Sequence, residues 1–384
     1  MRLLILSLAF MAGATLPAPA APARAHFPLP EDAVVAIGDV HGDLTTLRGL
    51  LRSLGLVDSG DRWQGGKRHL VQTGDVLDRG PDSRKALELI MRLEKEAEAA
   101  GGRVVMVLGN HEVMNVCGDL RYTTREEFAA FAAEEDPAAR AHRKERILGI
   151  IRGGSPLLKS GPYRLLARSL DERTFETVFP PGFFAHRLAF SPQGRYGKWL
   201  LQRSVVHREG KSVFLHGGLS AAYGGLPAEE INRRVLSEVL RYLEAVSELE
   251  KLDVFDAALG LTELDRLIAV ETRAGPLHPS LVGPFRTIRE VLGGIAFDED
   301  GPLWYRGLAL GDERELAATV ERALRGQTAD RIVIGHSPLH ASVESRFAGR
   351  VFLIDTGMNQ KVYGGHPSAL VIPPQGPPAF WQVD

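Results

Sequence analysis

Five short runs of the sequence combine glycine with side chains that can bind metal ions or transfer protons. The ligand-type residues are aspartate, histidine and asparagine, which suit borderline or hard divalent cations. The glycines beside them let the backbone turn sharply and approach a ligand closely. The runs are Gly38-Asp39-Val40-His41-Gly42, Gly74-Asp75-Val76-Leu77-Asp78-Arg79-Gly80, Gly109-Asn110-His111-Glu112, His216-Gly217-Gly218 and Gly335-His336.

Each run taken alone is a weak signal. An aspartate after a strand is more often a turn or helix-capping residue, and a single histidine is more often structural. Together, however, they are hard to explain as turns, and two acids, one amide and three imidazoles from these runs suffice for two metal ions that share one carboxylate. Two ions about 3.5–4 Å apart can clamp a phosphoryl group and generate hydroxide at neutral pH. The residue types are therefore compatible with a dinuclear metal site of the kind that can act on phosphoryl groups.

Each run directly follows a short apolar segment, and such segments would position the runs together. Continuous Val, Ile and Leu segments are typical of strands buried on both faces, and strands that alternate with helices indicate an α/β sheet with parallel pairing. Ligands bind at the carboxyl ends of the strands in such sheets. We predict strands at Ala33–Ile37, His69–Thr73, Arg103–Leu108, Ser212–Leu215, Arg331–Ile334, Val351–Ile354 and Ser368–Ile372, and helices over 44–54 and 86–93, the latter closed by Gly101-Gly102.

The character of the chain changes over residues 119–210, where polar, alanine-rich stretches appear. These stretches predict helices at Thr123–Glu135 and Ala138–Arg152, whereas Gly153–Gly161 and Phe179–Gly197 are predicted to be loops. A second helical block is predicted over about 228–275 from apolar residues at helical spacing. We interpret residues 26–384 as one large domain in which 119–210 is a helical insertion over one end of the sheet.

The order of the motifs, GDxHG, GDxxDRG, GNHE, HGG and GH, resembles that of the phosphoprotein phosphatases in the calcineurin-like metallophosphoesterase superfamily. The resemblance spans roughly residues 33–375 and is most specific in GDVLDRG and GNHE. Leu303-Trp304-Tyr305-Arg306-Gly307 and Ile354-Asp355-Thr356-Gly357 are similar to segments of the bacterial-type Shewanella-like phosphatases. The SAPNY-type loop of the toxin-sensitive eukaryotic members is not found near the C-terminus. The resemblance implies the calcineurin-like α/β fold, a central β-sandwich flanked by helices.

The resemblance also implies which motif residues bind the metals. Asp39 and His41 would hold the first ion and Asp75 would bridge both, while the second ion would be held by Asn110, His216 and His336. The cofactors would be two divalent metal ions. Manganese is the ion we expect, and sites of this kind also accept Fe and Zn.

The implied catalytic roles fall on the remaining motif residues. His111 would be the general acid that protonates the leaving oxygen, oriented by Asp78, because imidazole is the usual proton donor near neutral pH. Arg79 and Arg306 would bind phosphate oxygens through their forked guanidinium groups, with help from Asn110. Water activated by both ions would attack phosphorus directly, without a phosphoenzyme.

Three functions fit these motifs. We expect a phosphoprotein phosphatase acting on phospho-Ser, phospho-Thr or phospho-Tyr, whose partners are phosphorylated proteins, peptides or small molecules. The alternative is a small-molecule phosphoesterase or dinucleoside polyphosphate hydrolase with the same metal core. A nucleotide site would require aromatic side chains near the metals for stacking. The insertion offers such side chains, which suit its own core equally well: Tyr163, Phe183, Phe184, Tyr196 and Trp199. A non-catalytic scaffold is disfavoured because every ligand and the acid are present.

The composition excludes several other classes of protein. Hydrophobic residues make up 44% of the chain and charged residues 24%, as in globular proteins. There are 46 basic and 48 acidic residues, so no basic excess is available to bind nucleic acid. The single cysteine, Cys117, excludes an internal disulfide framework and a cysteine-rich zinc site, and we expect it to be buried.

Residues 1–25 have the pattern of a secretory signal peptide. Arg2 precedes the apolar stretch 3–16, and the small-residue stretch 17–25 follows. Ala23-Arg24-Ala25 offers a cleavage site, and Ala18-Pro19-Ala20 offers an earlier one. We therefore expect export, to the periplasm where the host has one, with no membrane attachment after cleavage.

Other polar residues receive structural interpretations. We predict that Asp43 caps the helix that begins near Leu44, that Glu112 supports the site through a hydrogen bond, and that Asp355 closes a turn. The segment 298–301 lacks the spaced ligands of a calcium loop. The histidines predicted to be structural are His69, His186, His207, His278, His340 and His366.

Overall fold

The structure, a computed structural model, describes residues 23–24, 28–160, 170–339 and 342–383. Its strands form two mixed sheets. The strand order in the first is β1 (Ala23–Arg24), β11 (Ala379–Gln382), β10 (Ser368–Ile372), β2 (Val34–Ile37), β3 (His69–Gln72) and β4 (Arg103–Met106). The strand order in the second is β5 (Val206–Glu209), β6 (Ser212–Leu215), β7 (Arg331–Ile334), β9 (Val351–Leu353) and β8 (Glu344–Arg346).

The apolar segments of the sequence make the parallel part of each sheet. β2, β3 and β4 pair in parallel, as do β6, β7 and β9, whereas β10, β5 and β8 pair antiparallel to their neighbours. The two sheets face each other through a buried apolar cluster that includes Ala36, Val71, Phe214, Val333 and Leu370. The predicted α/β fold with a central β-sandwich is therefore confirmed.

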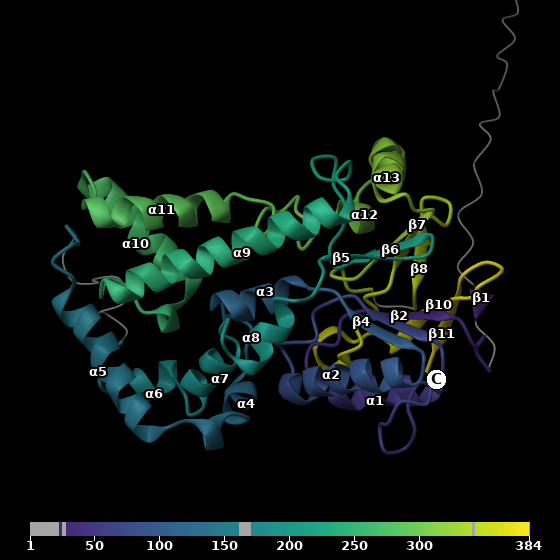
Figure 1. Ribbon diagram of the computed structural model, residues 1–384, viewed down its shortest axis with the longest axis horizontal. Helices are drawn as coiled ribbons and strands as arrows, with labels where there is room; N and C mark the ends of the chain where they lie inside the picture. The colour runs from purple at the N-terminus through teal and green to yellow at the C-terminus, as the bar shows by residue number, and fades with distance from the viewer. Residues whose placement is uncertain (1–22, 25–27, 161–169, 340–341, 384) are drawn as a thin grey trace, which may run out of the picture.

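Helices flank the sandwich on both outer sides. Figure 1 shows α1 (Leu44–Ser53) and α2 (Ser83–Ala99) outside the first sheet and α13 (Glu313–Gln327) outside the second. The leucines that predicted α1 are buried along one face. Asp43 Oδ1 accepts a hydrogen bond from the Thr46 amide at 2.9 Å, which confirms Asp43 as the cap of α1.

Most of the other helices lie beside the sandwich (Figure 1). Residues 119–210 contribute α4 (Arg125–Ala129), the 3₁₀ helix η1 (Ala132–Glu134), α5 (Pro137–Gly153), α6 (Phe175–Val178), α7 (Phe183–Ala189) and α8 (Arg195–Leu200). The later helices are α9 (Ala228–Lys251), η2 (Ala257–Leu259), α10 (Gly260–Ala274) and α11 (Pro279–Leu292), of which α9 and α11 pack together. Two short helices, α12 (Gly307–Leu310) and α14 (Gln360–Tyr363), lie nearer the C-terminus of the chain.

Two predictions about the region 119–210 are wrong in detail. The single helix expected over Thr123–Glu135 is divided into α4 and η1, and α5 starts separately where Asp136 accepts the Ala138 and Ala139 amides. The segment expected to be a loop over Phe179–Gly197 contains α7 and α8. Its helices are stabilised by burial of Phe183 and Tyr196, a tertiary effect that short-range spacing does not reveal.

The N-terminal prediction falls mostly outside the described residues. Within the predicted signal segment only Ala23–Arg24 is described, and this short strand pairs in parallel with β11. In the described part of the chain, no helix combines the length and apolar character needed to cross a bilayer.

Candidate metal centre and active site

All of the predicted metal ligands lie just beyond the carboxyl ends of parallel strands. Asp39 and His41 follow β2, Asp75 follows β3, and Asn110 begins α3 (Asn110–Cys117) after β4. His216 and His336 follow β6 and β7 of the other sheet. Every one of these side chains is buried, so the fold gathers polar groups from both sheets in one place.

Asp75 lies at the centre of this cluster of buried polar side chains. Its Oδ2 atom lies 3.2 Å from His216 Nε2 and 3.7 Å from both His41 Nε2 and His111 Nε2. Two groups of ligand atoms therefore share Asp75: one with His41 and His111, and one with His216 and His336. One carboxylate common to two clusters is the arrangement that a bridging ligand requires.

The second cluster is held together by close contacts around His216. Its Nε2 atom lies 2.8 Å from Asn110 Oδ1 and 3.0 Å from His336 Nδ1. Asp39 lies at the edge, with its carboxylate 3.9 Å from both His216 Nδ1 and His41 Nε2. The structure thus brings together all of the residues that the sequence assigned to metal binding.

Backbone carbonyls fix the tautomers of the three imidazoles. Nδ1 of His41 lies 3.0 Å from the Leu77 carbonyl, and Nδ1 of His216 lies 2.9 Å from the Thr73 carbonyl. His336 Nε2 lies 3.1 Å from the carbonyl of Trp304. Carbonyl oxygens only accept, so these nitrogens carry the protons.

The unprotonated nitrogens of the same rings consequently face one another and the carboxylate of Asp75. Lone pairs at such distances repel unless an electrophile lies between them. Imidazoles oriented by carbonyls in this way, with an amide and a carboxylate oxygen beside them, are the usual environment of a bound divalent cation. The residues of both clusters therefore fit the metal ions that the sequence implies.

Asp355 adds a carboxylate that the sequence interpretation missed. It does close a turn, because its Oδ1 accepts the Gly357 amide at 3.1 Å, but its side chain also bonds to that of Asp39. Burial and the charges of Asp355 and Asp75 hold the pKa of Asp39 well above its usual range. Two buried carboxylates in contact favour a proton or a cation between them. The prediction of a turn residue alone is therefore corrected.

The turns that carry the motif residues are conformationally unusual. Positive φ angles occur at His41 (46°), Asp75 (56°), Asp78 (68°), Arg79 (67°) and His336 (68°). Non-glycine residues seldom adopt such angles, and their concentration at one site is typical of functional geometry held by its surroundings.

Glycine is required where these turns approach one another. A Cβ atom on Gly109 would lie 2.2 Å from Asp75 Oδ1. A Cβ atom on Gly335 would lie 2.4 Å from Asp39 Oδ1. The glycines of GNHE and of Gly335-His336 therefore let the ligand-bearing turns come into contact.

Glu112 holds two motif turns together. Its Oε2 accepts the amides of Asp75 (2.8 Å) and Gly109 (2.9 Å), and its Oε1 accepts those of Val76 (2.9 Å) and Leu77 (3.3 Å). Glu112 is fully buried, so these amides have no access to water. The interpretation of Glu112 as a supporting residue thus has a specific physical basis.

We predict that Glu112→Gln destabilises the fold. Glutamine keeps the size of the side chain but has only one acceptor oxygen, so two buried amides lose their partner. Each such loss costs about 1–3 kcal/mol, and relief of the repulsion between Glu112 and Asp75 offsets part of it, so we expect the free energy of unfolding to fall by about 1–3 kcal/mol. Denaturant unfolding at pH 8 tests this, above the pKa of about 7 that burial and Asp75 give to Glu112. Glu244→Gln, at an exposed position of α9, is the control, and equal stabilities of the two variants would contradict the prediction.

His111 and Asp78 form a buried pair beside the bridging carboxylate. His111 Nδ1 donates to Asp78 Oδ2 at 2.6 Å, and Asn115 Nδ2 donates to the same oxygen at 3.0 Å. Burial would lower the pKa of His111, but Asp75 and Asp78 raise it to about 9. By contrast, burial lowers the pKa of His41 to about 4. His111 therefore differs from the ligand candidate in the same cluster, although its Nε2 is also within reach of a metal.

The two predicted phosphate-binding arginines have different surroundings. Arg79 lies half-buried with its guanidinium 4.4 Å from the ring centroid of Tyr122 and 5.6 Å from that of Tyr363. Arg306 is exposed, and its Nη1 donates to the carbonyl of His336 at 2.5 Å and to Ser337 Oγ at 3.2 Å. Arg306 therefore supports the turn that carries a metal-ligand candidate.

The aromatic side chains proposed for nucleotide stacking lie elsewhere. Phe183 and Tyr196 are buried in the main apolar core, with Phe184 and Trp199 packed against it. Tyr163 lies outside the described residues. The rings next to the candidate catalytic groups are instead Tyr122, whose centroid is 5.1 Å from that of His111, and Tyr363, 5.4 Å from His41. The four of these aromatic residues that the structure describes therefore belong to the apolar core or pack against it.

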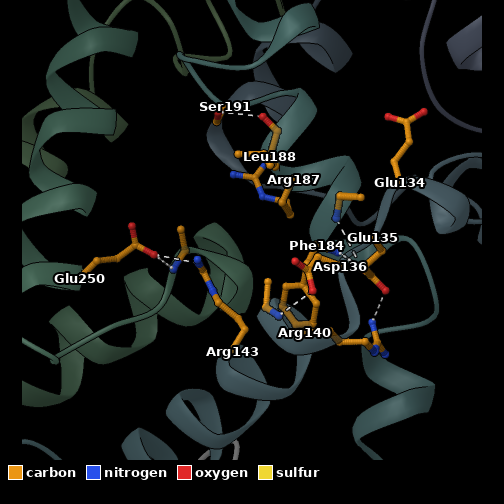
Figure 2. A pocket seen from close by; sticks show the side chains of 13 residues that line it. Glu134, Glu135, Asp136, Arg140, Arg143, Phe184, Arg187, Leu188, Ser191 and Glu250 are labelled. Atoms are coloured by element: carbon orange, nitrogen blue, oxygen red, sulfur yellow. Dashed lines mark hydrogen bonds and ion pairs between the residues drawn. The ribbon is translucent and has the colours of Figure 1, made fainter.

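A cavity of about 340 Å³ lies among the helices (Figure 2). Its lining residues come from η1, α5, α7, α9 and the segments beside them, and include no metal-ligand candidate. The charges of Arg140 and Arg143 inside it are neutralised by Glu135 and Glu250. This cavity is therefore separate from the candidate metal ligands.

These observations define the class of protein. The sequence matches the family described as calcineurin-like phosphoesterase over residues 33–260, and the chain belongs to this family. Within this family membership, the two ligand clusters provide the residues that could hold two divalent metal ions.

Two relatives of this chain carry the name Shewanella-like protein phosphatase. The chain is 38% identical over 204 residues to Shewanella-like protein phosphatase 2 of Arabidopsis thaliana, which covers 53% of this chain and 50% of the relative. It is 24% identical over 336 residues to Shewanella-like protein phosphatase 1 of Plasmodium berghei (strain Anka), covering 87% of this chain and 69% of the relative. The chain thus spans about half the length of the Arabidopsis relative. The predicted resemblance to the Shewanella-like phosphatases is confirmed.

A solved structure shares the fold. The cold-active protein-tyrosine phosphatase of a psychrophile Shewanella sp. superposes with a TM-score of 0.55 at 22% identity, covering 88% of this chain and 75% of the other. At this identity the likeness concerns the arrangement of strands and helices alone.

Proposed function

We propose that this chain is a metal-dependent phosphoprotein phosphatase that hydrolyses phosphomonoesters of Ser, Thr or Tyr side chains. The observation that carries the proposal is the position of Asp75. Its carboxylate is common to two buried ligand clusters, and the His111–Asp78 pair lies 3.7 Å away. The names of the Arabidopsis and Plasmodium relatives support the same activity.

Each group has a defined task in this reaction. Two divalent cations, when bound, supply charge that stabilises the phosphoryl group and lowers the pKa of water. Arg79 binds phosphate oxygens, since its guanidinium has no carboxylate partner within the described residues, and Arg306 and Asn110 assist. His111 gives its proton to the leaving oxygen, and Asp78 orients the imidazole. Removal of this proton from His111 is balanced by protonation of the alkoxide.

The metals that suit this donor set are borderline or hard divalent ions. Imidazole, carboxylate and amide ligands accept Mn, Fe and Zn, and we propose manganese as the working ion. Metal removal by a chelator followed by addition of single metals would rank them by recovered activity.

The test of the function compares substrate classes with one protein preparation. We expect manganese-loaded protein to hydrolyse p-nitrophenyl phosphate and members of a phosphopeptide panel, and chelated protein to be inactive. Faster hydrolysis of diadenosine tetraphosphate than of any phosphopeptide would replace the proposal with the dinucleotide hydrolase. If fully metal-loaded protein released no p-nitrophenolate from p-nitrophenyl phosphate, the result would favour a non-catalytic scaffold.

We also propose that the chain is exported. The support is the charged start, apolar stretch and small-residue cleavage sites within residues 1–25. We predict a mature N-terminus near His26, or near Ala21 if the earlier site is used. The two outcomes differ structurally, because only the second retains β1 and its pairing with β11. N-terminal sequencing of protein from the native host decides, and an intact Met1 in a cytosolic fraction would exclude export.

A further inference from the structure

The start of the region 119–210 contacts the turn that carries Asp78 and Arg79. The Tyr122 carbonyl accepts the Arg79 amide at 3.0 Å. Thr123 Oγ1 donates to Asp78 Oδ1 at 2.8 Å, and the buried Glu127 accepts the Asp78 amide at 3.1 Å. Three contacts therefore fix the backbone of this turn and the carboxylate of Asp78, which the proposed reaction needs to orient the proton donor.

This turn needs external support. Asp78 and Arg79 have φ angles of 68° and 67°, a conformation that costs free energy for residues with a Cβ atom. The hydrogen bonds from the neighbouring segment offset that cost. Glu127 is itself held by a capping box with Thr124 at the start of α4, so the support has a rigid base.

The Tyr122 ring adds a second contact to Arg79. The guanidinium carbon lies 4.4 Å from the ring centroid, within the range of a cation–π interaction. Within the described chain, no carbonyl or side-chain oxygen accepts a hydrogen bond from this guanidinium, and its Nε atom is buried without a partner. Stacking on Tyr122, with Tyr363 at 5.6 Å, is therefore what orients the group. The N–H edge is left free for a phosphate.

We infer that Tyr122, which lies outside every motif, is a positioning residue for phosphate binding. It acts through Arg79: its carbonyl holds the backbone of Arg79 and its ring holds the guanidinium. The inference rests on the proposed function, because it assigns Arg79 the phosphate. It also gives the beginning of the 119–210 region a specific role in the reaction.

The test separates the ring from the carbonyl. Tyr122→Leu keeps the carbonyl and removes the aromatic face, whereas Tyr122→Phe keeps both. We expect Tyr122→Leu to raise KM for p-nitrophenyl phosphate and Ki for inorganic phosphate by about three- to thirtyfold, as expected from loss of a cation–π contact. We expect kcat to change less than KM and metal content to stay at the wild-type value. Tyr122→Phe should remain within about twofold of wild type in both constants, because its ring still stacks on the guanidinium.

A double-mutant cycle tests the route of the effect. In an Arg79→Ala background, Tyr122→Leu should change Ki for inorganic phosphate by less than about twofold, because its partner is gone. An undiminished effect in that background, or no effect of Tyr122→Leu on Ki in the wild type, would overturn the inference. Tyr122→Met replaces leucine if thermal unfolding shows that leucine lowers Tm. An inactive metal-loaded wild type would instead contradict the proposed function, so the two failures are distinguishable.

Discussion

Asp75→Asn is expected to lower phosphatase activity by at least about three orders of magnitude and to weaken metal binding at both clusters. The Asp75 carboxylate is the only acidic group common to the two clusters found among the described residues. A neutral amide cannot balance the charge of two dications as a shared carboxylate does. Asparagine has nearly the same size, so the loss would reflect charge rather than packing.

The measurement combines elemental analysis with turnover. Metal content after dialysis and kcat on p-nitrophenyl phosphate in excess manganese are recorded for the variant and the wild type. Asp43→Asn is a matched control, because asparagine caps a helix about as well as aspartate does and Asp43 only caps α1. Near-normal turnover of Asp75→Asn with both metals bound would remove Asp75 from the bridging position.

Most of this site could be predicted from the sequence because each ligand-type residue lies in a short local pattern of residue types. An apolar strand that ends in a glycine and an acid or imidazole predicts its own position at a sheet edge. Parallel strands bring those ends together. Asp75 and His216 are far apart in the sequence and still lie 3.2 Å from each other. Asp43 was likewise predictable from its place before a run of helically spaced leucines.

Asp355 carried the same signal and was nevertheless interpreted as a turn residue. It directly follows an apolar strand, as the ligand candidates do, but lies in no glycine-histidine motif. Its contact with Asp39 depends on β9 lying next to β7, a pairing that strand sequences do not specify. Sheet order is a tertiary property, because the preference of a strand depends on the neighbours against which it packs.

The sequence did not identify Tyr122, Thr123 and Glu127 as part of the site, for a different reason. Their contacts with Asp78 and Arg79 join segments more than 40 residues apart, and their residue types are common in loops and helix caps. The capping box Thr124–Glu127 predicts where a helix starts, but it does not predict which distant residues that helix start contacts. Supporting residues of a site are therefore visible only when the fold is known.

His111→Asn is expected to lower kcat on an alkyl phosphate by about 10²–10⁴-fold while both metals stay bound. His111 donates through Nδ1 to Asp78 at 2.6 Å, so its Nε2 is the atom available to the leaving oxygen. An alkoxide is a poor leaving group and needs a proton, whereas p-nitrophenolate needs little help. The loss should therefore be much smaller on p-nitrophenyl phosphate.

The same nitrogen lies in a ligand cluster with His41 and Asp75, so the variant decides between two roles. Loss of a metal by elemental analysis would make His111 a ligand. Equal losses on good and poor leaving groups would assign it to substrate binding or charge stabilisation. His142→Asn, at an exposed position of α5, controls for loss of an imidazole as such.

Asp78→Asn should act in the same direction as His111→Asn. The double variant should fall far short of the product of the single effects, because an acid and the residue that orients it work as a unit.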